Sequence, residues 1–279
     1  MTHSFLKESL SARFSKSVFV ITIVLLLPVL GVQGQQFKPE KTFSFNADYF
    51  TVDNLANVYS INGGTISMAD SSGNIKHSFS NKSAGSLNFI DAVNPLRIMA
   101  YARDFSLIYF LDNQLAVQST IDLRNQLLTD AWPVCNSNNE GFWIVNPQEN
   151  TIVKYDYTLK IIAQSQPLNL LVADDIKPLA LQENDRWLVL HNDKNGLMIF
   201  DRLGSYFKTV RDETIECFFM SEKNMVYFSD GAFVFVDLET GSEIKRIKTG
   251  ITNVKGIYWL HDKIYVLSQS QITLFSITG

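Results

Sequence analysis

Carboxylate and amide side chains recur at the starts of short apolar segments along this chain, and such oxygen ligands can hold a metal ion. The three candidates are Asp130, Asp175 and Asn253. If these three side chains converged on one point, they could bind a divalent cation, and that cation could polarise a small substrate for hydrolysis. A metal-dependent hydrolase or lactonase is therefore one of the two functions that the sequence leaves open.

A second set of side chains lies near the same segment starts and suits contacts to a ligand. Its members are Trp132, Asp175, Lys177, Glu216 and Lys255. The tryptophan can stack on a planar or apolar group, and the other four supply charges of both signs. The alternative is that the charged residues only pair with one another across water, where such pairs stabilise a fold very little.

Other groups that commonly carry out catalysis are sparse. Asp174 and Asp175 form the most concentrated acidic pair, but neighbouring residues of an extended segment point to opposite faces and do not share a proton. His77, His191 and His261 do not have the spacing of metal ligands. The sequence also contains no nucleophile elbow, glycine-rich phosphate loop or paired-cysteine motif. These observations weigh against an enzymatic centre without removing the hydrolase or lactonase alternative, and we expect no cofactor.

Composition and charge limit the class of protein. The 279 residues have a formal net charge of -4 at pH 7, and the first part of the chain carries more basic than acidic groups, so the remainder is more acidic still. An acidic protein is a poor binder of nucleic acid. Cys135 and Cys217 lie in apolar segments, where we expect small buried hydrophobic residues rather than a disulfide.

The first 34 residues have the pattern of an export signal. Three basic residues precede an apolar stretch over residues 18–30, which is too short to span a bilayer. Small residues follow Pro28 and suit cleavage near Gly34. We expect an exported protein, periplasmic or secreted, that reaches a membrane only through an uncleaved signal or through a partner.

A repeated strand-and-turn pattern runs through the rest of the chain and must position these side chains. Six apolar segments recur at intervals of 36 to 45 residues. Their last residues are Asp70, Asp112, Asp156, Asp201, Asp237 and Ser276. A carboxylate at a strand end can accept hydrogen bonds from the turn amides that follow, so turn formation rather than metal binding explains the five aspartates. Each interval has room for four short strands, which is the repeat of a β-propeller.

The last repeat has three strands, and an unpaired alternating segment over residues 40–45 precedes the first repeat. Pairing that segment beside the final strand would close the ring and remove two exposed sheet edges. We therefore predict an all-β fold. It comprises a signal peptide over residues 1–34 and a six-bladed β-propeller over residues 35–279, whose last blade is closed by an N-terminal strand. We expect such a closed ring to be monomeric.

The strand-aspartate-turn pattern, with glycine after Asp70, Asp201 and Asp237, resembles the exported six-bladed propellers of the TolB-like, NHL-like and YVTN-like groups. The resemblance extends over the whole repeat region, but no active-site residue of a specific family is carried over. It implies a binding scaffold in envelope assembly, a sugar lactonase or a quinone-dependent dehydrogenase. Since no catalytic side chains converge, we predict a non-catalytic scaffold that binds a protein partner in a bacterial cell-envelope complex. The alternative remains the metal-dependent hydrolase or lactonase.

Overall fold

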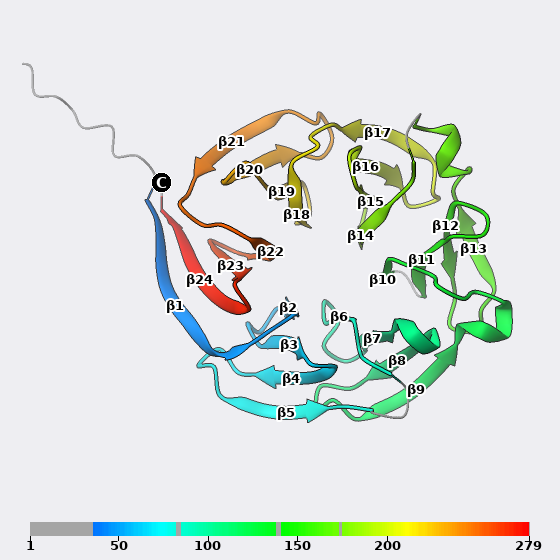
Figure 1. Cartoon of the computed structure of the whole chain (residues 1–279), viewed down its shortest axis with the longest axis horizontal. Helices are drawn as coiled ribbons and strands as arrows, with labels where there is room; N and C mark the ends of the chain where they lie inside the picture. The colour runs from blue at the N-terminus through cyan, green and yellow to red at the C-terminus, as the bar shows by residue number, and fades with distance from the viewer. Residues whose placement is uncertain (1–35, 82–84, 138–140, 173–174, 279) are drawn as a thin grey trace, which may run out of the picture. The chain divides into compact units, whose positions relative to one another are not determined.

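Six four-stranded antiparallel sheets form a ring in the computed structural model of the protein (Figure 1). The structure describes residues 36–81, 85–137, 141–172 and 175–278, so the predicted signal peptide lies outside the described residues. The inner strands of successive sheets contact one another, and the inner strand of the last blade contacts that of the first. The predicted six-bladed β-propeller is therefore confirmed. Within the described ranges, no helix is long and apolar enough to cross a lipid bilayer.

Blades one to three follow one another along the chain, and the strands of each run in order from the axis outward. Blade one contains β2 (Tyr49–Val52), β3 (Val58–Asn62), β4 (Thr65–Ala69) and β5 (Ile75–Phe79). Blade two contains β6 (Phe89–Asp91), β7 (Ile98–Ala102), β8 (Leu107–Leu111) and β9 (Val117–Asp122). Blade three contains β10 (Val134–Asn136), β11 (Phe142–Asn146), β12 (Thr151–Tyr155) and β13 (Ile161–Gln164). Short 3-10 helices occur in the connections: η2 (Arg103–Phe105), η3 (Leu123–Gln126) and η4 (Leu168–Leu170).

Blades four and five have the same order, and blade six combines both ends of the described chain. Blade four contains β14 (Pro178–Glu183), β15 (Trp187–Asn192), β16 (Gly196–Asp201) and β17 (Tyr206–Val210). Blade five contains β18 (Ile215–Met220), β19 (Asn224–Ser229), β20 (Ala232–Asp237) and β21 (Glu243–Lys248). Blade six contains β22 (Val254–Leu260), β23 (Lys263–Ser268), β24 (Gln271–Thr278) and the outer strand β1 (Gln36–Asn46).

The core lies between the faces of neighbouring blades. Strands in the middle of a blade, such as β11 and β12, are buried on both faces and carry nearly continuous apolar runs. Outer strands such as β9 and β21 have one face toward solvent and are largely exposed. The hydrophobic runs of the sequence therefore mark the middle strands and hold the blades against each other, which fixes the inner strands around the axis.

The repeated aspartates form the turns between the third and the outer strands. Oδ1 of Asp112 accepts the backbone N–H groups of Gln114 and Ala116, at 2.8 and 2.9 Å. Asp156 and Asp201 make the same two contacts with the residues two and four positions further on. The prediction that these carboxylates form turns is confirmed, because their oxygens bind the amides of their own turns.

The N-terminal strand completes the last blade, as predicted. β1 pairs antiparallel with β24 (Figure 1), with Phe37 opposite Ile277. The ring of Phe37 stacks on that of Phe275 with 4.2 Å between centroids, and Phe43 is buried. β1 also reaches blade one, because Nζ of Lys41 donates a hydrogen bond to the carbonyl oxygen of Ser71 at 2.7 Å. One strand therefore closes the sheet and binds the last blade to the first.

Candidate functional site

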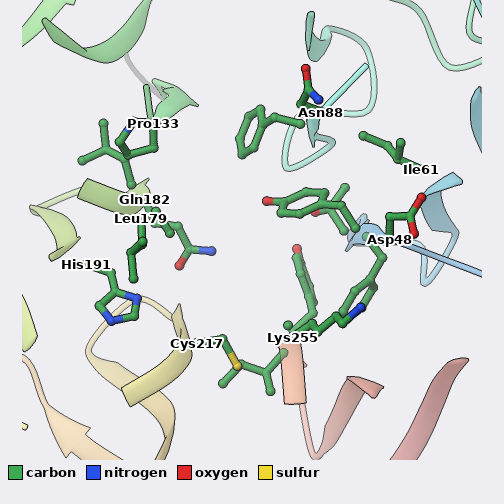
Figure 2. A pocket seen from close by; sticks show the side chains of 18 of the residues that line it. Asp48, Ile61, Asn88, Pro133, Leu179, Gln182, His191, Cys217 and Lys255 are labelled. Carbon is green, nitrogen blue, oxygen red and sulfur yellow. The ribbon is translucent and has the colours of Figure 1, made fainter. Parts of the chain in front are cut away.

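A cavity of about 500 Å³ lies among the inner strands, at the end where these strands begin. All six blades contribute to its wall, and we call it the axial cavity. In Figure 2, Leu179 and His191 of blade four lie across it from Asp48 and Ile61 of blade one. Ligand-binding pockets typically measure about 300–1,000 Å³. The axial cavity therefore has the size of a binding site.

Bulges at the same position of three consecutive inner strands place three side chains in the axial cavity. The pairings of β14 with β15, β18 with β19 and β22 with β23 each shift register directly after the first residue of the inner strand. The inserted residues are Leu179, Glu216 and Lys255, and all three line the cavity. A bulge re-aims the side chain that it inserts. Blades four to six thus present an apolar, an acidic and a basic group to one space.

Aromatic rings from blades one to three line another part of the wall. The ring centroids of Tyr49 and Phe89 are 5.4 Å apart, and those of Phe89 and Trp132 are 6.5 Å apart with the planes nearly perpendicular. The guanidinium group of Arg103 lies over the Trp132 ring at 5.4 Å, which is a cation-π contact. Aromatic rings provide large apolar contact area with defined geometry. This part of the wall suits an apolar or planar group.

Two neutral polar side chains also face the axial cavity from blade four. His191 is buried, and burial lowers its pKa to about 4, so the imidazole is neutral at pH 7 and offers one donor and one acceptor. The side-chain oxygen of Gln182 accepts the N–H of Met220 at 3.0 Å. That contact fixes the amide and leaves its two N–H donors for a ligand. The cavity can therefore form hydrogen bonds to uncharged groups.

We expect His191 to make the protein less stable at pH 5 than at pH 7. Its pKa of about 4 in the folded protein lies below the value of about 6.5 for an exposed histidine, so between these values the unfolded chain binds a proton that the folded chain does not. The contribution of the neutral His191 to the free energy of unfolding is complete above about pH 6.5 and is lost as the pH falls. Between pH 7 and pH 5 the free energy of unfolding should decrease by about 2 kcal/mol. Urea unfolding of the parent and of His191→Gln at both pH values measures this difference. Equal pH dependence of the two proteins would show that the histidine is not held neutral.

A second cavity of about 290 Å³ lies at the other end of the inner strands. The two cavities share Tyr49, Thr51, Phe89, Leu181, Gln182 and Tyr258. Beyond this shared layer the wall is acidic, with Asp91, Glu183, Asp185 and Glu222, and no basic side chain is among the described residues that line it. Burial raises the pKa of Asp91, and the nearby charge of Glu183 adds to the shift. The two ends of the inner strands therefore differ in charge.

Glu183 lies at the centre of a buried polar network between blades three and four. Its Oε1 accepts the indole N–H of Trp143 at 2.9 Å and lies 3.4 Å from Nζ of Lys154. Its Oε2 accepts the hydroxyl of Ser137 at 2.6 Å. The side chains of Glu183 and Lys154 are 0% and 5% exposed. These contacts give Glu183 a structural role in joining the two blades.

The structure brings together three of the five predicted ligand contacts. Trp132, Glu216 and Lys255 line the axial cavity. The other two, Asp175 and Lys177, are exposed, precede β14 and do not line it. In blade four the position equivalent to Glu216 and Lys255 is the bulged Leu179, two residues after the predicted lysine.

The three predicted metal ligands do not line either cavity. Asp130 and Asn253 are exposed, and their backbones adopt φ values of 58° and 55° in the connections before the inner strands. Asp175 is exposed as well, and Asp174 lies outside the described residues. Among the residues that the structure describes, no group of three His, Cys, Asp or Glu side chains could hold a metal ion. The geometry of these side chains therefore does not favour the hydrolase or lactonase alternative.

Both cysteines are free and buried, and Cys217 lines the axial cavity. Burial raises the pKa of the Cys217 thiol, and the charge of Glu216 adds to the shift. Because the thiolate is the reactive form of cysteine, this thiol stays protonated and unreactive at pH 7. The axial cavity offers apolar contact, neutral hydrogen-bonding groups and three exposed charged side chains, Asp48, Glu216 and Lys255.

Comparisons with known proteins show the fold alone. No protein-family model matches the sequence, and no curated protein matches it. Among solved structures, the chain is similar to the WD40 domain of Neurospora crassa Pan2. The TM-score is 0.62 at 9% sequence identity, and the match covers 84% of this chain and 90% of that chain.

Proposed function

We propose that this protein is a non-catalytic β-propeller scaffold that binds a protein partner on the face where the axial cavity opens. The observation that carries the proposal is a set of large apolar side chains exposed on this face. They are Phe105, Leu127 and Leu170, which we call the apolar crescent. Each lies in or beside a connection, η2, η3 or η4, at the end of the blades where the inner strands begin.

The apolar crescent exposes hydrophobic surface to water when no partner is bound, which is unfavourable in free energy. Leu127 is 83% exposed and Leu170 is 72% exposed. Leucines at the opposite end, such as Leu203 at 71%, are exposed as well, but the crescent lies at the end that carries the axial cavity. Exposed apolar residues beside a cavity are typical of interaction surfaces. Burial against a partner would remove this apolar surface from water.

Contacts among the connections link the crescent to the axial cavity. Arg103 belongs to the same 3-10 helix as Phe105, and its guanidinium group lies over Trp132 at the cavity wall. The N–H of Leu123, at the start of η3, donates to the carbonyl oxygen of Ser106 at 3.0 Å. The connections that carry Phe105 and Leu127 are therefore joined to each other and to the cavity wall, and a single partner can cover this part of the surface.

The place of action that we propose is the cell envelope. The support comes from the sequence, whose first 34 residues combine basic residues, a short apolar stretch and small residues near Gly34, as an export signal does. We propose a periplasmic or secreted monomeric ring that joins an envelope complex through its partner. Fractionation of cells that produce the tagged protein tests this location, and recovery from the cytoplasm with the N-terminal segment intact would contradict it.

We expect the double variant Leu127→Asp/Leu170→Asp to lose the partner while keeping the fold. Each charge would have to be desolvated in the interface, whereas both positions are exposed in the free protein. The measurement is recovery of a stoichiometric partner from envelope extracts on the immobilised protein. A matched control is Leu203→Asp, an exposed leucine in a turn at the opposite end of blade four, which should retain the partner. Equal recovery by parent and double variant would contradict the proposed face.

A further inference from the structure

Three charged side chains line the axial cavity: Asp48, Glu216 and Lys255. Oδ2 of Asp48 accepts the backbone N–H of Gly63 at 3.0 Å. Within the described part of the protein, Glu216 and Lys255 form no ion pair. Glu216 and Lys255 are exposed and project from equivalent bulges of neighbouring blades. Elsewhere exposed charges do pair, as Glu40 does with Lys263 at 2.8 Å. The sequence left open that the charged residues pair with one another across water, and Glu216 and Lys255 do not form such a pair. Both remain available to charges on a bound molecule.

The rest of the wall suits an uncharged group. Gln182, Tyr49 and Tyr258 belong to the layer shared by the two cavities, and His191 faces the axial cavity as a neutral imidazole. Hydroxyl, amide and imidazole groups can bind the N–H and C=O groups of a peptide backbone. These groups are themselves uncharged, and the acidic side chains Asp91 and Glu183 lie beyond this layer in the second cavity, so an anion placed among them would lose its hydration with no positive charge in the layer. Apolar contact comes from the aromatic rings and, on the side of blade four, from Leu179.

We infer that the axial cavity binds an extended segment of the protein partner with an uncharged aromatic or aliphatic anchor residue inside the cavity, a basic residue beside Glu216 and an acidic residue beside Lys255. This inference rests on the proposed function and specifies the partner's chemistry. The anchor residue packs between Leu179 and the aromatic wall. The flanking charges pair with the two exposed side chains, and because those lie on neighbouring blades they fix the direction in which the segment runs.

Selection of displayed random peptides on the immobilised full chain tests the inference. Peptides enriched on the parent should share an apolar or aromatic residue flanked by one basic and one acidic residue. The double variant Glu216→Lys/Lys255→Glu should enrich the same anchor with the order of the flanking charges reversed. Both substitutions are at exposed positions, so the fold should be kept, and the melting temperature checks this. Enrichment of one sequence class by both proteins would overturn the inference.

Binding of a parent-selected peptide gives a second, quantitative readout. Leu179→Trp places a larger side chain in the cavity, where it should exclude the anchor residue of the peptide. We expect peptide affinity to fall about thirtyfold, which is the usual effect of losing one anchor residue at an interface. Leu203→Trp, in the same blade at the opposite end, should leave affinity unchanged. Lys255→Glu should weaken binding about tenfold and Lys223→Glu, an exposed lysine in a turn of blade five, should not. Affinity that is insensitive to Leu179→Trp would overturn the inference.

The result also separates this inference from the proposed function. If no peptide class is enriched, or if the selected peptides bind outside the cavity, the inference fails. In that case a partner that is lost only from Leu127→Asp/Leu170→Asp would still support the scaffold. If no partner binds the face where the axial cavity opens, both the proposed scaffold function and the inference about the bound segment fail.

Discussion

A protein that lacks residues 37–45 is expected not to fold into a stable monomer. The deletion removes most of β1, including the stacked ring of Phe37 and the buried ring of Phe43. Loss of one buried phenylalanine such as Phe43 typically costs about 3–5 kcal/mol, and a whole domain is stabilised by about 5–15 kcal/mol. With the partly buried ring of Phe37 and the pairing with β24 lost as well, the total cost approaches the stability of the domain. The deletion also leaves β24 as an open sheet edge, which favours aggregation.

Size-exclusion chromatography and thermal unfolding measure the effect of the deletion. We expect aggregated protein or a loss of the cooperative transition. Phe43→Ala should lower the free energy of unfolding by about 4 kcal/mol, whereas Lys38→Ala, an exposed position in the same strand, should change it little. A monomeric deletion variant with the melting temperature of the parent would show that β1 does not hold the ring closed.

Substitution of Glu183 by alanine is expected to destabilise the protein by about 3–5 kcal/mol, the usual cost of removing one partner of a buried ion pair. The variant leaves the Lys154 ammonium group buried without its carboxylate. It also removes the acceptor for the Trp143 indole and the Ser137 hydroxyl. Denaturant unfolding at pH 7 measures the difference.

Two further variants separate the charge from the packing. Glu183→Gln keeps the volume and a hydrogen-bond acceptor, so it should be less destabilising than the alanine. Lys154→Met/Glu183→Gln removes both charges and should recover part of the stability, because no unpaired charge remains buried. If Glu183→Ala lowered the free energy of unfolding by less than about 1 kcal/mol, the pair of Glu183 and Lys154 would be no stronger than an exposed surface pair, which contradicts a buried network.

The ring could be predicted from the sequence because its signals are local. A turn carboxylate such as Asp112 binds amides two and four residues away, so each turn leaves a mark within a few positions. The closing strand could be predicted from one alternating segment without a partner and one blade that lacked a strand. Neither inference needed the position of a side chain in space.

The candidate site was harder to predict because it depends on register and on contacts between blades. Glu216 and Lys255 follow the starts of their strands at the expected offset, but β14 begins three residues after Asp175, so Leu179 and not Lys177 takes the equivalent position. His191 lies on the second strand of blade four and pairs with the small residue Ala180, which also lines the axial cavity. Nothing in the linear pattern marks a second-strand side chain as part of the wall.

The buried network of Glu183 could not be predicted for the same reason. Its partner Lys154 lies in another blade, and no motif links the two positions. Both residues belong to strands in which a charged residue would be expected on the solvent face. Only the packing of blade three against blade four shows that the two charges compensate each other.

Photo-crosslinking in cells that produce the protein shows which face of the ring contacts a partner. A photo-reactive amino acid is placed at position 127 in the apolar crescent and, in a separate variant, at position 203 on the opposite face; both native leucines are exposed, at 83% and 71%. We predict that light produces one defined crosslinked protein from position 127, and that Glu216→Lys/Lys255→Glu weakens this product. A crosslinked partner from position 203 alone, or none from position 127, would contradict partner binding on the face where the axial cavity opens.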